Sequence, residues 1–160
     1  KARNQLAVNR PAIYMVDLVG RMITDADPHP AVFATLCEAL DRMEAGHDPA
    51  WPLLRFQWSL LSETGYRPML EVDGDDEVVA FSSSLGGVLP DTGGQDHVRV
   101  RRETVQLLRM VDEVEQPLQP VSPECLERAC RLLGHYLRDL IGSESAAMRW
   151  MWNSARETAC

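Results

Sequence analysis

The stretch from Trp51 to Leu89 constrains the fold of this chain most strongly, because its first part is apolar on nearly every side of a helix. Only Arg55, Gln57 and Ser59 interrupt the apolar run. A helix that is apolar all round is stable only where other elements cover every face. The sequence therefore predicts a central helix in the middle of a core, with the apolar residues Leu53, Leu54, Phe56, Trp58, Leu60 and Leu61.

Proline and glycine bound this central helix. Pro49 and Pro52 flank its start, where proline is tolerated in the first turn. Gly65 follows its end, because glycine favours the left-handed cap conformation, and Pro68 prevents the helix from resuming. We therefore expect the helix to end close to Gly65.

A small hairpin is predicted after the central helix. Leu70 to Val72 and Val78 to Phe81 are short β-prone runs, separated by an acidic tract at residues 73–77. Gly86 and Gly87 then supply the flexible backbone of a turn. We call residues 66–97 the knuckle and expect it to be an insertion in a helical domain.

The remaining apolar patterns are helical. The second helix should begin with Asp27 as its cap and Pro28 at its first position, and should turn Phe33 inward. The fifth should begin at Ser122 and end at Gly142. Residues 1–160 are thus expected to form one mainly α domain, a bundle of five to six helices with a β-hairpin knuckle, the other helices covering Asn9 to Ile23, Glu103 to Glu115 and a segment from about Ser145.

Composition excludes several classes of protein. The net charge of −8 argues against wholesale nucleic-acid binding by this segment. No apolar run is long enough to span a bilayer or to act as a signal peptide, so we expect a soluble, cytoplasmic protein without membrane partners. No C-x-x-C pair occurs, so neither disulfides nor structural zinc are expected from the cysteines, which are Cys37, Cys125, Cys130 and Cys160.

No catalytic motif is present, and we expect neither enzymatic activity nor a cofactor. The histidines lack the spacing of a zinc helix, and the patterns of nucleophile elbows, phosphate loops and dinucleotide-binding turns are missing. The acidic side chains of residues 73–77 have the oxygen ligands that suit a hard cation but lack the spacing of a calcium loop. A solvated turn is the competing interpretation.

One face of the fifth predicted helix is basic. Arg128, Arg131, His135 and Arg138 are spaced three, four and three residues apart and therefore project from one side. All cations except Lys1 are arginines, which suit carboxylate and phosphate groups. One interpretation is a solvated face on which Glu124 pairs with Arg128 and Glu127 with Arg131. The other is a site for an acidic peptide, extended by Arg99, Arg101 and Arg102 if the fourth helix lies alongside.

The order of several motifs resembles the C-terminal part of the RecO family of DNA repair proteins. The matching segments are Tyr14, Asp17 and Leu18; Phe33, Leu36 and Leu40; Phe56, Leu60, Leu61, Gly65, Tyr66 and Leu70; Phe81, Ser82, Gly86 and Gly87; and Leu132, Leu133, Tyr136, Leu137, Ile141 and Gly142. Many members of this family carry two C-x-x-C pairs in the knuckle. Here these positions hold Asp73, Asp76, Pro90 and Gly93, so the resemblance predicts no zinc site.

The resemblance implies a recombination mediator that binds DNA and the acidic tail of single-stranded DNA-binding protein, and that works with RecR to load RecA. It also implies an OB-fold domain upstream of Lys1, which would supply most of the DNA affinity. The partner-binding residues expected in this chain are Arg128, Arg131 and Arg138, with Arg101 and Arg102. The alternative is a stand-alone helical protein-interaction domain without a DNA role.

Overall fold

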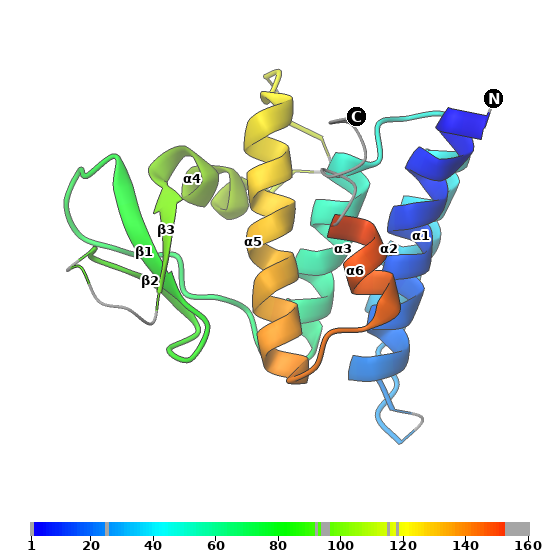
Figure 1. Ribbon diagram of the computed structural model, residues 1–160, viewed down its shortest axis with the longest axis horizontal. Helices are drawn as coiled ribbons and strands as arrows, with labels where there is room; N and C mark the ends of the chain where they lie inside the picture. Colours follow the sequence, from blue (N-terminus) through cyan, green and yellow to red (C-terminus); the bar gives the residue numbers. More distant parts are fainter. Residues whose placement is uncertain are drawn as a thin grey trace.

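The protein is mainly α-helical, as the sequence predicts. The computed structural model describes residues 2–152 except 25, 92, 94–96, 115 and 118, with side chains from Val8 onward. Three strands lie between the third and fourth helices of the described residues (Figure 1). The helices are α1 (Ala2–Met22), α2 (Pro30–Glu44), α3 (Ala50–Glu63), α4 (Arg102–Met110), α5 (Pro123–Ile141) and α6 (Ala146–Trp152), and the strands are β1 (Val78–Ser82), β2 (Gly87–Leu89) and β3 (Val98–Arg101).

Helix α3 is the central helix, which confirms the prediction from its apolar run. It packs against α2 and α5, and its buried side chains lie on nearly every face. One of them is polar: the amide of Gln57 is fully buried, and its Nε2 donates to Tyr14 Oη at 3.3 Å and to the Cys130 carbonyl at 3.1 Å. This side chain therefore joins α1, α3 and α5.

Helix α5 divides the molecule into two parts. In Figure 1 the sheet and α4 lie on one side of it, and α1, α2, α3 and α6 lie on the other. The helix begins where predicted, with Ser122 Oγ accepting the Cys125 N–H at 3.1 Å, and it ends at Gly142 with a φ of 76°. Phe81 of β1 packs edge-on against Tyr136 of α5, with ring centroids 5.3 Å apart. The sheet is thereby fixed to the helix.

The strand pairing differs from the predicted hairpin. The sheet is antiparallel in the order β2-β1-β3, and Leu70 to Val72 lie outside it. Met69 instead forms an isolated bridge to Gly87, where a Cβ atom would lie 2.4 Å from the Met69 carbonyl oxygen. Two strands were not predicted. Strand β2 begins at Gly87, where a turn was expected, and β3 has a Val-Arg-Val-Arg alternation with the period of a half-buried strand.

Three details of the first two helices also differ from expectation. Helix α1 starts at Ala2 and includes Pro11, whereas the predicted helix begins at Asn9. Helix α2 starts two residues later than predicted, with His29 at the cap and Pro30 in the first turn. Phe33 is 64% exposed, because Val32 and Leu36 take the inward positions of α2.

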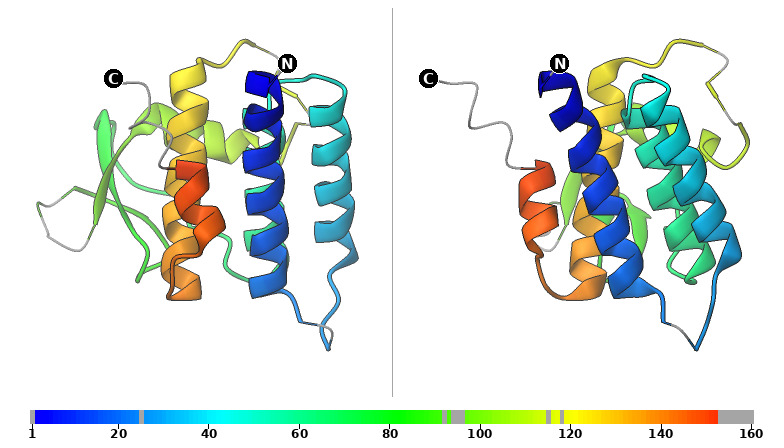
Figure 2. Two further views of the ribbon diagram at one scale, coloured as in Figure 1. Left: turned by 45° about the vertical axis from the view of Figure 1, so that its right-hand side comes forward. Right: turned by 90° about the vertical axis from the view of Figure 1, so that its right-hand side faces the viewer.

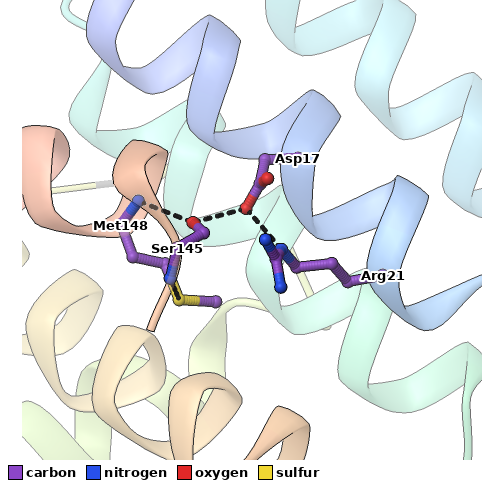
Figure 3. Close-up of polar contacts among 4 residues, drawn as sticks. All are labelled: Asp17, Arg21, Ser145 and Met148. Carbon is purple, nitrogen blue, oxygen red and sulfur yellow. Dashed lines mark hydrogen bonds and ion pairs between the residues drawn. The ribbon is translucent and has the colours of Figure 1, made fainter. Parts of the chain in front are cut away.

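A polar contact ties the last helix to the first. Ser145 Oγ accepts the Met148 N–H at 3.0 Å and donates to Asp17 Oδ2 of α1 at 2.7 Å (Figure 3). Arg21 Nε donates to the same carboxylate oxygen at 3.0 Å. Helices α1 and α6 lie side by side in both views of Figure 2. Asp17 therefore positions the first turn of α6 through the side chain of Ser145.

Candidate functional site

A groove between β3 and α5 brings together three of the arginines predicted for the partner site. We call it the β3–α5 groove; its volume is about 270 Å³. Arg101 belongs to the strand wall, and Arg128 and Arg131 belong to the helix wall. Apolar side chains lie between these cations. The complete lining is Val98, Arg99, Val100, Arg101, Thr104, Arg128, Arg131, Leu132 and His135.

Carboxylates neutralise most of this positive charge. Glu103 Oε1 contacts both Arg128 Nη2 and, at 3.9 Å, Arg101 Nη1. Arg131 pairs with Glu127 at 2.9 Å, as the solvated-face interpretation predicts. The pair predicted between Glu124 and Arg128 is replaced by the pair with Glu103 of α4. Because one glutamate pairs with two arginines, the groove keeps a net positive charge. This charge can attract an anion.

The remaining predicted arginines lie outside the groove. Arg102 Nε donates to the Asp76 carbonyl at 2.6 Å, and its backbone N–H donates to the Glu77 carbonyl at 2.8 Å. Arg102 therefore holds the acidic tract against the start of α4. Arg138 pairs with Asp139 at 3.1 Å and lies about 10 Å beyond Arg131 along α5. Arg99, which the sequence suggested together with Arg101 and Arg102 as an extension of the site, does line the groove.

His135 lies at one end of the groove and is electrostatically perturbed. Partial burial is the main reason that the pKa of His135 is lower than its ordinary value, and Arg138 and Arg131 lower it further. Asp139 and Glu144 act in the opposite direction without cancelling the shift. The imidazole is therefore neutral at neutral pH, and a bound anion would favour its protonated form.

The knuckle is held by polar contacts near the positions that the resemblance assigns to the second cysteine pair. Asp91 Oδ1 accepts the Gly93 N–H at 3.2 Å and lies 3.2 Å from His97 Nε2, while Asp91 Oδ2 accepts from Arg99 Nε at 2.8 Å. The Gly93 N–H, followed by His97 and Arg99, lowers the pKa of Asp91. The described residues contain no cluster of three or more metal-ligating side chains. Cys37, Cys125 and Cys130 are free thiols, and Cys160 lies outside the described residues.

The fold and the groove define a class of protein. It is a helical domain with a small inserted sheet, and a cationic groove lies between the sheet and the helices. Within the described ranges, no helix combines the length and apolar character required to cross a membrane. The chain belongs to the family of recombination protein O C-terminal domains, whose model matches residues 4–147. The resemblance in its motifs is thereby confirmed.

Relatives of this chain are DNA repair proteins named RecO. The protein from Pseudomonas aeruginosa is 29% identical over 150 residues, which cover 91% of this chain and 61% of that protein. The protein from Myxococcus xanthus is 27% identical over 158 residues, covering 94% of this chain and 64% of that protein. This chain therefore spans less than two thirds of the length of these relatives. No solved structure matches it.

Proposed function

We propose that this chain is the helical part of a cytoplasmic recombination mediator that acts in DNA repair by binding rather than by catalysis. The family match over residues 4–147 is the observation that carries this proposal. The acidic balance of the chain suits a scaffold for protein contacts better than a DNA-binding surface. An OB-fold elsewhere in the protein would then provide most of the DNA contacts, with RecR as a partner in loading RecA.

The β3–α5 groove is the proposed docking site for the acidic tail of single-stranded DNA-binding protein. Such a tail needs cations for its carboxylates and an apolar surface for its hydrophobic side chains. Arg101, Arg128 and Arg131 provide the cations, and Val100 and Leu132 contribute apolar surface between them. The guanidinium groups suit carboxylates because they form paired hydrogen bonds.

Replacement of Arg128 or Arg131 by glutamine is expected to weaken the binding of a fluorescently labelled tail peptide about five- to tenfold. The reason is that each change removes a charge-assisted hydrogen bond to the peptide. Fluorescence anisotropy measures the affinity, and the loss should shrink at high salt. Arg138→Gln should have a smaller effect, because Arg138 lies beyond the groove. Arg42→Gln is the matched control, since Arg42 pairs with Glu38 at 2.9 Å on α2. Unchanged affinity in both groove variants would place the tail elsewhere.

Glu103→Gln is expected to strengthen peptide binding about threefold. The glutamate competes with the ligand because it occupies Arg128 and Arg101 in the free protein. Its replacement keeps the shape of the side chain and releases both cations. Isothermal titration calorimetry measures the change in peptide affinity. Glu124→Gln removes the same negative charge near Arg128 and controls for the altered net charge. Weaker binding by Glu103→Gln would show that this residue supports the site instead of competing for it.

Peptide binding is expected to tighten about three- to tenfold between pH 7.5 and pH 5.5. The pKa of His135 is lowered in the free protein, so protonation there occurs below about pH 6.5. A bound carboxylate raises this pKa, and by linkage affinity rises as pH falls through that window. The same titration with His135→Gln should be nearly flat. A parallel increase in both proteins would assign the pH dependence to another group.

A further inference from the structure

The lining of the β3–α5 groove shows that it runs along an edge of the sheet. All four residues of β3 line it, from Val98 to Arg101. Alternate side chains of a strand point to opposite faces, so a cavity that touches all four must follow the strand's edge. In the order β2-β1-β3 this edge of β3 has no partner strand among the described residues.

The register identifies the backbone groups at that edge. Arg102 lies opposite Glu77, and its N–H donates to the Glu77 carbonyl at 2.8 Å. Hydrogen-bonded pairs alternate along an antiparallel ladder, so Val100 with Val79 and Val98 with Phe81 are the next ones. The N–H and C=O groups of Arg99 and the N–H group of Arg101 therefore point away from β1, toward the open edge. The carbonyl of Arg101, which is the N-cap of α4, accepts the first hydrogen bond of that helix.

The two walls of the groove match in length. The strand wall from Val98 to Arg101 measures about 10 Å, and the helix wall from Arg128 to His135 also measures about 10 Å. Val98 and Val100 share one face of the strand, and Arg99 and Arg101 share the other. Val98 lies opposite Phe81, which packs on Tyr136 of α5, so the valines share the face that α5 covers. A segment lying along this edge therefore meets the valines and the helix wall on one face and Arg99 and Arg101 on the other.

We propose that the acidic peptide binds as an additional β-strand, pairing its backbone with the N–H and C=O groups of Arg99 and with the N–H group of Arg101. Strand addition supplies affinity through main-chain hydrogen bonds and specificity through alternate side chains. The fitting partner is an extended segment in which acidic and apolar residues alternate. Its carboxylates on one face lie toward Arg99 and Arg101, and its apolar side chains on the other face lie toward Val98 and Val100, with Arg128 and Arg131 of α5 beside them. This inference rests on the proposed docking of an acidic tail in the same groove.

Backbone N-methylation of the labelled peptide, one residue at a time, tests strand addition because it removes single N–H donors while leaving every side chain in place. Methylation at the positions that face β3 is expected to weaken binding at least tenfold, and at the intervening positions less than threefold. The losses should therefore alternate with a period of two. Arg128→Gln, measured with the unmethylated peptide, reports whether the groove is the site.

Amide hydrogen exchange in the protein provides a second readout. Saturation with the unmethylated peptide should slow exchange at Arg99 and Arg101 at least tenfold, with little change at Val98 and Val100, which already pair with β1. Losses without alternation, or no protection at Arg99 and Arg101, would overturn strand addition even if Arg128→Gln weakens binding. A peptide that does not bind the parent protein would overturn the proposed docking site itself.

Discussion

Replacement of Gln57 by glutamate is expected to destabilise the protein by about 3 to 4 kcal/mol at pH 7.5, although the side chain keeps its size. Gln57 is fully buried, and its Nε2 donates to Tyr14 and to the Cys130 carbonyl. A glutamate carboxylate has no N–H group, so both hydrogen bonds that Nε2 donates are lost. The carboxylate also brings an unpaired negative charge into the core. Burial raises the pKa of such a carboxyl far above its value in the unfolded chain.

The loss of stability in Gln57→Glu should depend on pH. Because the folded-state pKa is raised, the unfolded state ionises first, and the difference from the parent grows as pH rises above about 4.3. Each further pH unit adds about 1.4 kcal/mol until the folded-state pKa is reached. Urea unfolding of variant and parent at pH 5 and pH 7.5 measures the difference. Gln57→Leu, which carries no charge, is the control, and its difference from the parent should not change with pH.

Replacement of Gly87 by valine is expected to cost about 3 kcal/mol or more, because the new side chain has no space. A Cβ atom at this position would lie 2.4 Å from the Met69 carbonyl oxygen and 3.0 Å from the Met69 nitrogen. Backbone atoms cannot move aside as a flexible side chain does, so the segment around Met69 must separate from β2. The hydrogen bond from the Val88 N–H to the Met69 carbonyl, 2.8 Å long, would break.

Gly20 provides a matched control for Gly87. Gly20 lies in helix α1, and a Cβ atom added there would have no atom within 4 Å other than those of its chain neighbours and the helix's own backbone. Gly20→Ala should therefore raise the stability by about 0.5 to 1 kcal/mol through its helix propensity. Thermal unfolding followed by circular dichroism compares the two variants with the parent. A Gly87→Val protein as stable as the parent would contradict the close approach of Met69 to β2.

The helices were predictable because their signals are local. The apolar run of α3 and the residues Ser122 and Gly142 around α5 fix these elements from a few neighbouring positions. The strand pairing depends on segments that are distant in sequence, such as Val79 opposite Val100, and local pattern does not select between partners. The predicted partner of β1 was accordingly wrong, and its true partners follow it in the chain.

The candidate site was predictable for the residues that share one helix face. Arg128 and Arg131 are one turn apart and line the same groove. Arg138 shares their face but lies about 10 Å farther along the axis, and spacing alone does not reveal where the groove ends. Arg102 depends on tertiary structure, because the carbonyl of Asp76 that it contacts belongs to another segment. Glu103 was missed as a shared partner for the same reason.

The contact between Asp17 and Ser145 joins two helices that are made far apart in time during synthesis. The two residues are 128 positions apart. At about 5 to 20 residues per second, a ribosome needs roughly 6 to 26 s to make the chain between them. Helix α1 is therefore complete long before its partner α6 exists, and its side beside α6 stays uncovered in the nascent chain. The packing of α1 against α6 is therefore completed only after the intervening chain has been made.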